Sequence, residues 1–385
     1  MRRFVLLTVC AIVLVAFVVR GNRDPFFFGK RLRADFAQDY IGAQALLSQE
    51  ELYPVLGPAF ERIGLKWDAG HRSTHPPSAF LLALPLAGFP YPVALRIWAV
   101  AMALCMVVAA RAFGLPWPWA ILAALLSLAW PPMRHSTQQY TPIWLLGLAL
   151  AYRFRARPLL SGAWVAFASL PKFLAASALL AHARLGQWKA VAGFIAVWLA
   201  TALALVAIRL DAWGAYLYGN EIDFMSQTLR DDNGALGIVA WRLGGSIGVA
   251  AIAMLVVVVL WVSRRSSDDC AWASLTWLGI ALLPIAWVYS VLPLLPWLLR
   301  VVWVGRVLPS AFGAAALLIP LLGPRPTLRP WSVALCIFMA GVAFLLQAFA
   351  ENRAAATVIR RFPWLIPIVG AQREESEPRA AIGPD

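Results

Sequence analysis

The stretch LLSGAWVAFASLPKFLAASALLA, residues 159–181, decides the kind of fold that this chain can adopt. Its residues are apolar or small apart from Lys172, which directly follows Pro171. A membrane-spanning helix needs about 20 apolar residues, and proline bends or breaks a helix because it lacks a backbone donor. Broken helices occur at membrane depth only where they are buried in protein or line a watery cavity. The stretch therefore predicts a helical membrane bundle with a site inside it.

The rest of the chain has the same apolar character. It has 385 residues, of which 61% are hydrophobic, and its mean hydropathy is +0.72. Because a water-soluble domain cannot bury so much apolar surface, we expect an all-α polytopic membrane protein with about 10–13 membrane helices, some short or re-entrant. The other apolar runs cover residues 4–19, 77–89, 93–112, 117–131, 140–153, 190–208, 236–262, 270–290, 292–304, 307–322 and 331–350.

The first run, residues 4–19, follows Arg2 and Arg3 and has two interpretations. It could be a signal peptide or a retained membrane helix. No small-x-small cleavage pattern precedes Gly21, and apolar runs continue to the far end of the chain. We expect a retained helix.

The formal net charge of +14 does not indicate a nucleic-acid partner. The basic residues separate the apolar runs, as expected for cytoplasmic loops beside anionic lipid headgroups. We therefore expect membrane lipids as partners and no nucleic acid. The main basic clusters are Arg153-Arg155-Arg157, Arg184-Lys189, Arg264-Arg265 and Arg360-Arg361.

Two polar loops, residues 20–76 and 209–235, contain most of the acidic residues. With a cytoplasmic N-terminus, both loops would lie on the non-cytoplasmic side, and we expect surface helices in them. The many basic residues of the first loop fit the positive-inside rule only in part, although long loops orient membrane proteins weakly. We expect one integral membrane domain over residues 1–370 and a disordered polar tail over 371–385.

The first loop contains ADFAQDYIGAQALLSQEELYP, residues 34–54, with two carboxylates four residues apart. If residues 35–49 are helical, Asp35 and Asp39 share a face. Like charges at this spacing repel, which would raise one pKa and suit a general base. A solvated amphipathic helix on the membrane surface would explain the spacing equally well.

Several cationic and amide side chains could bind a ligand. Lys172 is an ionisable group inside an apolar run, and burying its charge there costs free energy. A phosphate partner would compensate the charge. Alternatively, the side chain could snorkel to the membrane interface. Lys30, Arg31 and Arg33 could hold a phosphate or attract an anionic lipid, or they could simply snorkel to the membrane interface. A polar segment between two short apolar runs contains Arg134, His135, Gln138 and Gln139. Its amide side chains could bind sugar hydroxyls, or the segment could be an ordinary loop.

A metal site is not expected. Asp68, His71 and His75 have a helical spacing, but Gly70 and Pro76-Pro77 interrupt the helix that would align them. We expect His75 to be a hydrogen-bonding residue in the wall of a site.

Taken in order, these segments resemble glycosyltransferase family 87, the polyprenol-phosphate-sugar-dependent transferases of the C-type glycosyltransferase fold. In this chain His75 stands where an aromatic residue is usual, Gln138 replaces a glycine, and Val288 and Tyr289 replace an acid and a histidine. The segments are DFAQDYIGAQALLSQEELY (35–53), THPPSAFLLALPLA (74–87), TQQYTPIWLLGLALA (137–151), SGAWVAFASLPKFLAA (161–176), DNGALGIVAWRL (232–243) and LLPIAWVYSVLPLLP (282–296).

The resemblance implies an enzyme of a bacterial cytoplasmic (inner) membrane with its active site on the extracytoplasmic side. It would transfer a sugar from polyprenyl phosphate to an envelope glycolipid or glycan. We expect the sugar to be mannose, with arabinofuranose and glucose as alternatives. Inversion would use Asp35 as the general base, and neither a nucleotide sugar nor a metal cofactor would be needed. Candidates for the donor phosphate are Lys172, Arg31, Arg33, Arg134 and Arg242. Candidates for the other substrate contacts are Asp39, Tyr40, Trp67, His75, Gln138, Gln139, Asn233 and Tyr289.

Two other classes of protein remain open. A transporter or lipid-linked sugar flippase would also have broken helices and charge near the membrane midplane. Such proteins usually contain internal repeats, and the sequence has no detectable one. A non-catalytic scaffold for envelope assembly is the other alternative.

Overall fold

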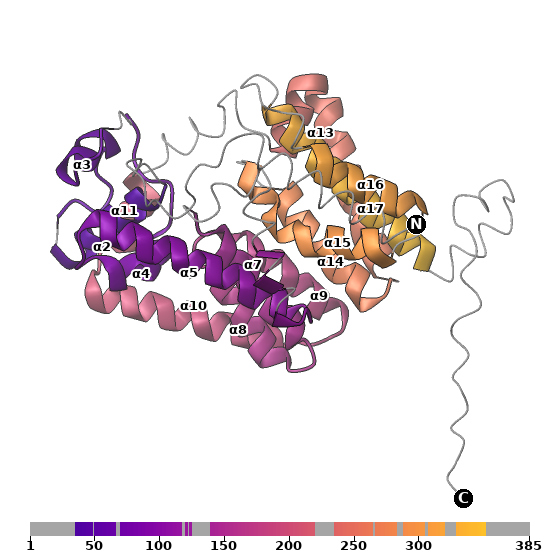
Figure 1. Ribbon diagram of the computed structural model, residues 1–385, viewed down its shortest axis with the longest axis horizontal. Helices are drawn as coiled ribbons and strands as arrows, with labels where there is room; N and C mark the ends of the chain where they lie inside the picture. The colour runs from indigo at the N-terminus through magenta and orange to yellow at the C-terminus, as the bar shows by residue number, and fades with distance from the viewer. Residues whose placement is uncertain are drawn as a thin grey trace, which may run out of the picture.

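A computed structural model describes residues 35–48, 50–66, 70–117, 120–121, 123–124, 139–219, 235–264, 266–282, 288–304, 307–319 and 329–351. Within these ranges the regular structure is helical, with no strand (Figure 1). The elements are α2 (Phe36–Ser48), α3 (Leu56–Arg62), α4 (Pro77–Ala83), η1 (Leu84–Leu86), α5 (Tyr91–Ala112), α7 (Thr141–Arg153), α8 (Pro158–Ser169), η4 (Phe173–Ala178), α9 (Leu179–Arg184), α10 (Lys189–Ile208), α11 (Ala212–Gly219), α13 (Leu236–Ser263), α14 (Asp268–Ala281), η5 (Val288–Leu294), α15 (Leu295–Val304), α16 (Val307–Leu318) and α17 (Arg329–Glu351).

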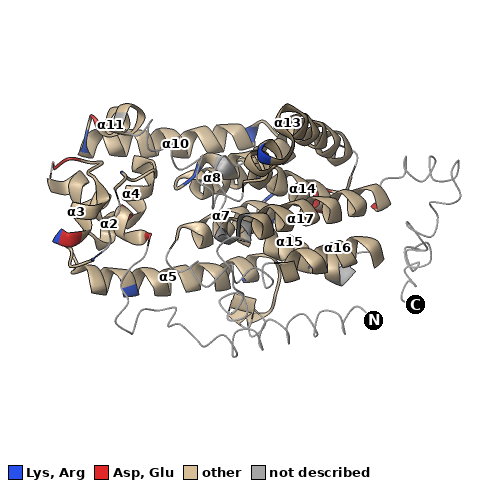
Figure 2. Cartoon of the chain, turned by 90° about the horizontal axis from the view of Figure 1, so that it is seen from above, with Lys and Arg blue, Asp and Glu red and all other residues tan. Residues whose placement is uncertain are grey.

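Four of these helices are long and apolar enough to cross a membrane: Tyr91–Ala112, Lys189–Ile208, Leu236–Ser263 and Trp331–Glu351. Figure 2 shows α10 with few charged residues along its length, as expected for a helix that faces lipid. Shorter apolar helices accompany them at Pro77–Leu86, Pro158–Ser169, Leu292–Val302 and Val307–Leu318. The prediction of an all-α, multi-pass membrane protein with some short helices is confirmed.

The break predicted at Pro171 is present. Helix α8 ends at Ser169, Lys172 has an extended backbone, and the chain continues as the 3-10 helix η4. The hydroxyl of Ser78 donates to the carbonyl of Leu170 at 2.6 Å. A side chain from α4 thus satisfies a carbonyl left without its helical partner at the end of α8.

Helices α5, α7, α8 and α10 form one connected layer, in which α8 packs against both α7 and α10. Two glycines allow α8 and α10 to approach closely. A Cβ added to Gly162 would lie 1.8 Å from the carbonyl oxygen of Ala190, and one added to Gly193 would lie 2.0 Å from that of Leu159. Small residues of this kind are the usual means of close helix packing in membranes.

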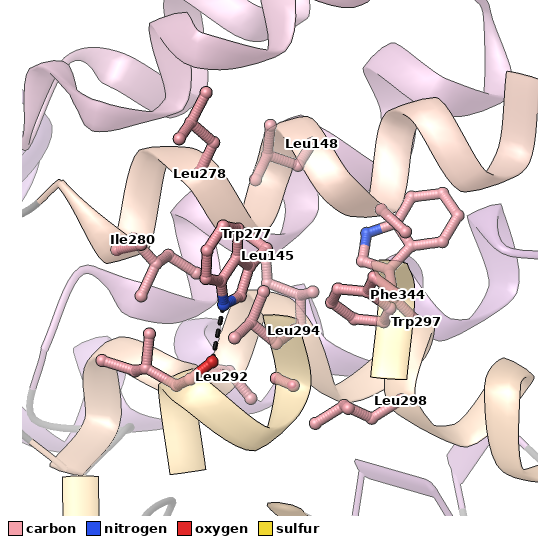
Figure 3. Close-up of a cluster of buried hydrophobic side chains, with 14 of the residues drawn as sticks. Leu145, Leu148, Trp277, Leu278, Ile280, Leu292, Leu294, Trp297, Leu298 and Phe344 are labelled. Atoms are coloured by element: carbon pink, nitrogen blue, oxygen red, sulfur yellow. Dashed lines mark hydrogen bonds between the residues drawn. The ribbon is translucent and has the colours of Figure 1, made fainter. Parts of the chain in front are cut away.

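Helix α7 also joins this layer to the C-terminal half. Leu145 and Leu148 of α7 lie in the same buried cluster as Trp277 of α14 and Phe344 of α17 (Figure 3). The indole N–H of Trp277 donates to the carbonyl of Ile337 at 2.6 Å, so the buried ring is hydrogen-bonded. Helix α7 is therefore fixed on two sides, which makes it a rigid support for a site at its N-terminus.

The helix that was only supposed over residues 35–49 is present as α2, Phe36–Ser48. The interpretation as a solvated helix lying on a surface is wrong, because α2 is buried on most sides. A Cβ on Gly42 would lie 2.6 Å from the Phe80 ring of α4. At the C-terminal end of α2, the guanidinium of Arg209 donates to the carbonyls of Ala45, at 2.9 Å, and Glu50. These contacts fix α2 against α4 and the end of α10.

Candidate active site

The two acids of the first polar loop have different environments. Asp35 lies in the turn that leads into α2, where its carbonyl accepts the N–H of Gln38 at 3.2 Å, and it is half-buried. Asp39 lies one turn further along and is 2% exposed. Phe36 between them is fully buried and stacks on Trp98 of α5 at 4.5 Å between ring centroids. This anchor fixes the start of α2 and with it the position of both carboxylates.

Asp39 is paired with His75. The Oδ1 atom of Asp39 lies 2.7 Å from Nδ1 of His75, and both side chains are buried. The backbone of His75 is held as well, because the hydroxyl of Tyr53 donates to its carbonyl at 3.1 Å. The sequence predicted both residues as substrate contacts, but it gave no sign that they would bind each other across 36 positions.

Burial raises the pKa of Asp39 above its ordinary value, although the nearby His75 and Lys172 act in the opposite direction. Desolvation disfavours the charged form of a carboxyl group, and here it outweighs the stabilising neighbours. Asp39 therefore holds its proton to higher pH than an exposed aspartate does. Asp35 is less buried and is the carboxylate of the two that is easier for a substrate to reach.

Lys172 lies within electrostatic range of both Asp35 and Asp39. Beside it is a small pocket, which is lined also by the polar side chains of Gln139, Thr141 and Ser290. Each of these three side chains is less than 9% exposed. Thr141 is the first residue of α7, where a helix dipole places partial positive charge. An ammonium, an amide, two hydroxyls and a helix N-terminus are together well suited to an anionic group.

Tyr140 connects the carboxylates to this pocket. Its ring forms part of the pocket wall and lies edge-on to His75, with 5.7 Å between the ring centroids. Its hydroxyl donates to the carbonyl of Ala79 in α4 at 2.5 Å. The acids, His75 and the Lys172 pocket are therefore neighbours in one site, although they come from four separate parts of the chain.

The structure thus brings together Asp35, Asp39, His75, Gln139 and Lys172 from the predicted set. Tyr40 points elsewhere, because its hydroxyl donates to the carbonyl of Phe89 at 2.6 Å. Arg242 is an exposed residue of α13, and α13 lies at the other end of the molecule from α2 in both views (Figures 1 and 2). Predicted residues outside the described ranges are Arg31, Arg33, Trp67, Arg134, Gln138 and Asn233, and the side chain of Tyr289 is likewise not described.

Three residues of the site were missed from the sequence. Thr141 precedes Pro142, a pair typical of a helix start, so this position could have been recognised as a helix N-terminus. Tyr140 is recognisable only from its packing. Ser290 follows a stretch of apolar residues, and no sequence pattern around it distinguishes a ligand-binding serine from a structural one.

The described residues include no group of three His, Cys, Asp or Glu side chains that could hold a metal ion. Asp68 lies outside the described ranges, and His75 is hydrogen-bonded to Asp39.

A multi-pass helical bundle that surrounds carboxylates and a lysine-lined pocket has the architecture of an integral membrane enzyme. The family model described as glycosyltransferase family 87 matches residues 74–290, which is more than half of the chain. The chain belongs to this family and is a membrane glycosyltransferase. The matched residues include His75, Gln139 and Lys172 and begin after Asp35 and Asp39. No curated protein and no solved structure gives a significant match.

Proposed function

We propose that this protein is an inverting transferase that moves a sugar, mannose, from polyprenyl phosphate to a hydroxyl of an envelope glycolipid or glycan. The observation that carries the proposal is the pocket beside Lys172, which lies within electrostatic range of Asp35 and Asp39. Membership in a glycosyltransferase family supports a transferase over a transporter or flippase.

The donor phosphate binds at the mouth of the pocket lined by Lys172, Gln139, Thr141 and Ser290, because the pocket itself has a volume of only about 10 Å³. Its anionic oxygens would accept hydrogen bonds from groups that are otherwise costly to bury. The leaving group is a phosphate ester anion, so it needs positive charge where its own negative charge develops and no general acid. Arg31, Arg33 and Arg134 remain proposed additional contacts to this phosphate.

Asp35 acts as the general base. It takes the proton of the acceptor hydroxyl while the hydroxyl oxygen forms a bond to C1 of the sugar. The bond from C1 to the phosphate oxygen breaks on the opposite side, and its electron pair leaves with polyprenyl phosphate. A β-linked donor therefore gives an α-linked product. The step balances without a metal ion or a nucleotide, and we propose neither as a cofactor.

His75, paired with Asp39, forms a fixed wall next to the reacting groups. Because both side chains are buried and hydrogen-bonded, the pair can hold Tyr140 and α2 in place during the reaction. Trp67, Gln138, Asn233 and Tyr289 remain proposed contacts to the sugars. The site lies on the extracytoplasmic side of a bacterial cytoplasmic membrane, where envelope acceptors are present.

The proposal is tested with the purified full-length protein, radiolabelled polyprenyl-phosphate mannose and a lipid extract of source cells that lack the gene. We expect label to move from the donor to a component of the extract, and Lys172→Met to abolish this transfer. Lys189→Met, at an exposed lysine at the start of α10, is the matched control and should retain it. Movement of the donor across liposomes without any transfer would instead identify a flippase.

A further inference from the structure

A second and larger cavity, of about 680 Å³, lies on another face of α2. It is bounded by α2, by α3 and by the start of α5. The side chains that matter for its chemistry are Tyr40, Gln44 and Ser48 of α2, Glu50, Arg62 of α3 and Tyr91 of α5. A volume of this size is within the range of small-molecule sites and accommodates more than one sugar ring.

Residues in the wall of this cavity lie next to the two carboxylates, because Tyr40 directly follows Asp39 in α2. Tyr91, in its wall, lies within electrostatic range of Asp35 and Asp39. Its ring also stacks on Phe36, the residue that follows Asp35, with 6.4 Å between ring centroids. Lys172 has the same two carboxylates as electrostatic neighbours. Asp35 and Asp39 therefore interact electrostatically with a wall residue of the Lys172 pocket and with a wall residue of this cavity.

The groups around the cavity suit a carbohydrate. The amide of Gln44 donates to the hydroxyl of Tyr40 at 2.9 Å and to the carbonyl of Ala87 at 3.3 Å, so its orientation is fixed. Glu50 and Arg62 form an ion pair of 2.8 Å on the rim, and both side chains are more than half exposed. Fixed amides, charged groups and tyrosine rings bind sugar hydroxyls and sugar faces. A lipid chain would instead have to pass this charged rim.

We propose that this cavity binds the saccharide of the acceptor. The proposal rests on the proposed transferase function and adds to it the side from which the acceptor approaches. In-line displacement at C1 requires the attacking hydroxyl and the leaving phosphate on opposite sides of the sugar carbon. The two pockets share no lining residue, so a donor phosphate at Lys172 and an acceptor saccharide in this cavity would approach the carboxylates from different places, as this requirement demands.

The test compares the KM values for the two substrates. In Ser48→Trp, a large ring at an exposed position fills the cavity, and in Arg62→Gln the rim loses its charge. We expect the KM for the acceptor, titrated as the lipid extract of gene-deleted source cells, to rise about tenfold or more in Ser48→Trp and less in Arg62→Gln. The KM for polyprenyl-phosphate mannose should stay within about twofold of its original value.

Two control variants match these changes outside the cavity. Glu61→Trp adds the same ring at an exposed position of α3 that does not line the cavity, and Arg111→Gln removes an exposed arginine from the last turn of α5. Both should leave both KM values unchanged. An unchanged acceptor KM in Ser48→Trp and Arg62→Gln, with normal transfer, would overturn the acceptor assignment alone. Absence of transfer by the unaltered protein would overturn the proposed function and this assignment with it.

Discussion

At the scale of single residues, the central feature is that Asp35 and Asp39 differ in environment although they lie only four positions apart. Asp39 is buried and bonded to His75, so its carboxyl group is occupied by a partner inside the protein. Asp35 lies at the start of α2 and is only half-buried. A general base must reach the proton of a substrate hydroxyl, which favours Asp35 for that role. Asp39 then serves to position His75 and Tyr140.

The pairing of Asp39 with His75 predicts energetic coupling between them. His75→Phe leaves a buried carboxyl group without its partner, which should lower the free energy of unfolding by about 1–3 kcal/mol. Asp39→Ala should also destabilise the protein. Because both single variants remove the same hydrogen bond, the double variant should lose at least about 1 kcal/mol less than the sum of the two. Thermal unfolding in detergent measures this coupling, and strictly additive losses would contradict the pairing.

The raised pKa of Asp39 predicts a pH dependence of stability. Above the ordinary aspartate pKa of 3.8 and below the raised value, the folded state binds more protons at this group than the unfolded state does. The contribution of Asp39 to stability should therefore fall as the pH rises through this window. Melting temperatures of the unaltered protein and of Asp39→Asn, measured from about pH 4 to about pH 7, test this. The two curves should converge at low pH, and a constant difference between them would contradict the burial effect.

At the scale of elements, the sequence predicted helices and breaks better than contacts. The apolar helices and the break at Pro171 follow from local chemistry, because apolar runs and a missing N–H act on neighbouring residues. The pairing of Asp39 with His75 and the convergence of Thr141, Ser290 and Lys172 depend on packing between distant segments. The sequence therefore indicated which residues could form a site, but it did not indicate which of them bind each other.

The close packing of α8 on α10 gives a prediction at this scale. A Cβ at position 162 would overlap backbone atoms of Ala190, which cannot move independently of α10. Gly162→Ala should therefore lower the free energy of unfolding by about 1–3 kcal/mol and reduce transfer, because α8 leads directly to Lys172. Gly214→Ala is the matched control, since a Cβ there meets no atom within 4 Å. Equal melting temperatures for both variants would show that α8 and α10 are not in close contact at Gly162.

At the scale of the whole molecule, the apolar bundle and the site have separate roles. The long helices α5, α10, α13 and α17 provide the apolar surface of a membrane protein, whereas the polar site is built where α2, α4, α7 and the end of α8 meet. Under the proposed function, this arrangement would let a lipid-linked donor remain in the membrane while its phosphate reaches Lys172. In the proposed function, the acceptor saccharide reaches the same carboxylates from the cavity beside α2. Family membership defines the chemistry as glycosyl transfer. The Lys172 pocket and the larger cavity share no lining residue, which supports the proposed separate approaches of donor and acceptor.

The most direct test of the central claim is sugar transfer by Asp35→Asn, with Asp39→Asn as its matched partner. Transfer from polyprenyl-phosphate mannose to the lipid extract is measured together with binding of the donor lipid. We predict that Asp35→Asn binds the donor normally and that its transfer rate falls by about 100-fold or more, because the general base is lost. Asp39→Asn should keep most of its activity. Near-normal transfer by Asp35→Asn together with loss of transfer in Asp39→Asn would contradict the assignment of Asp35 as the base.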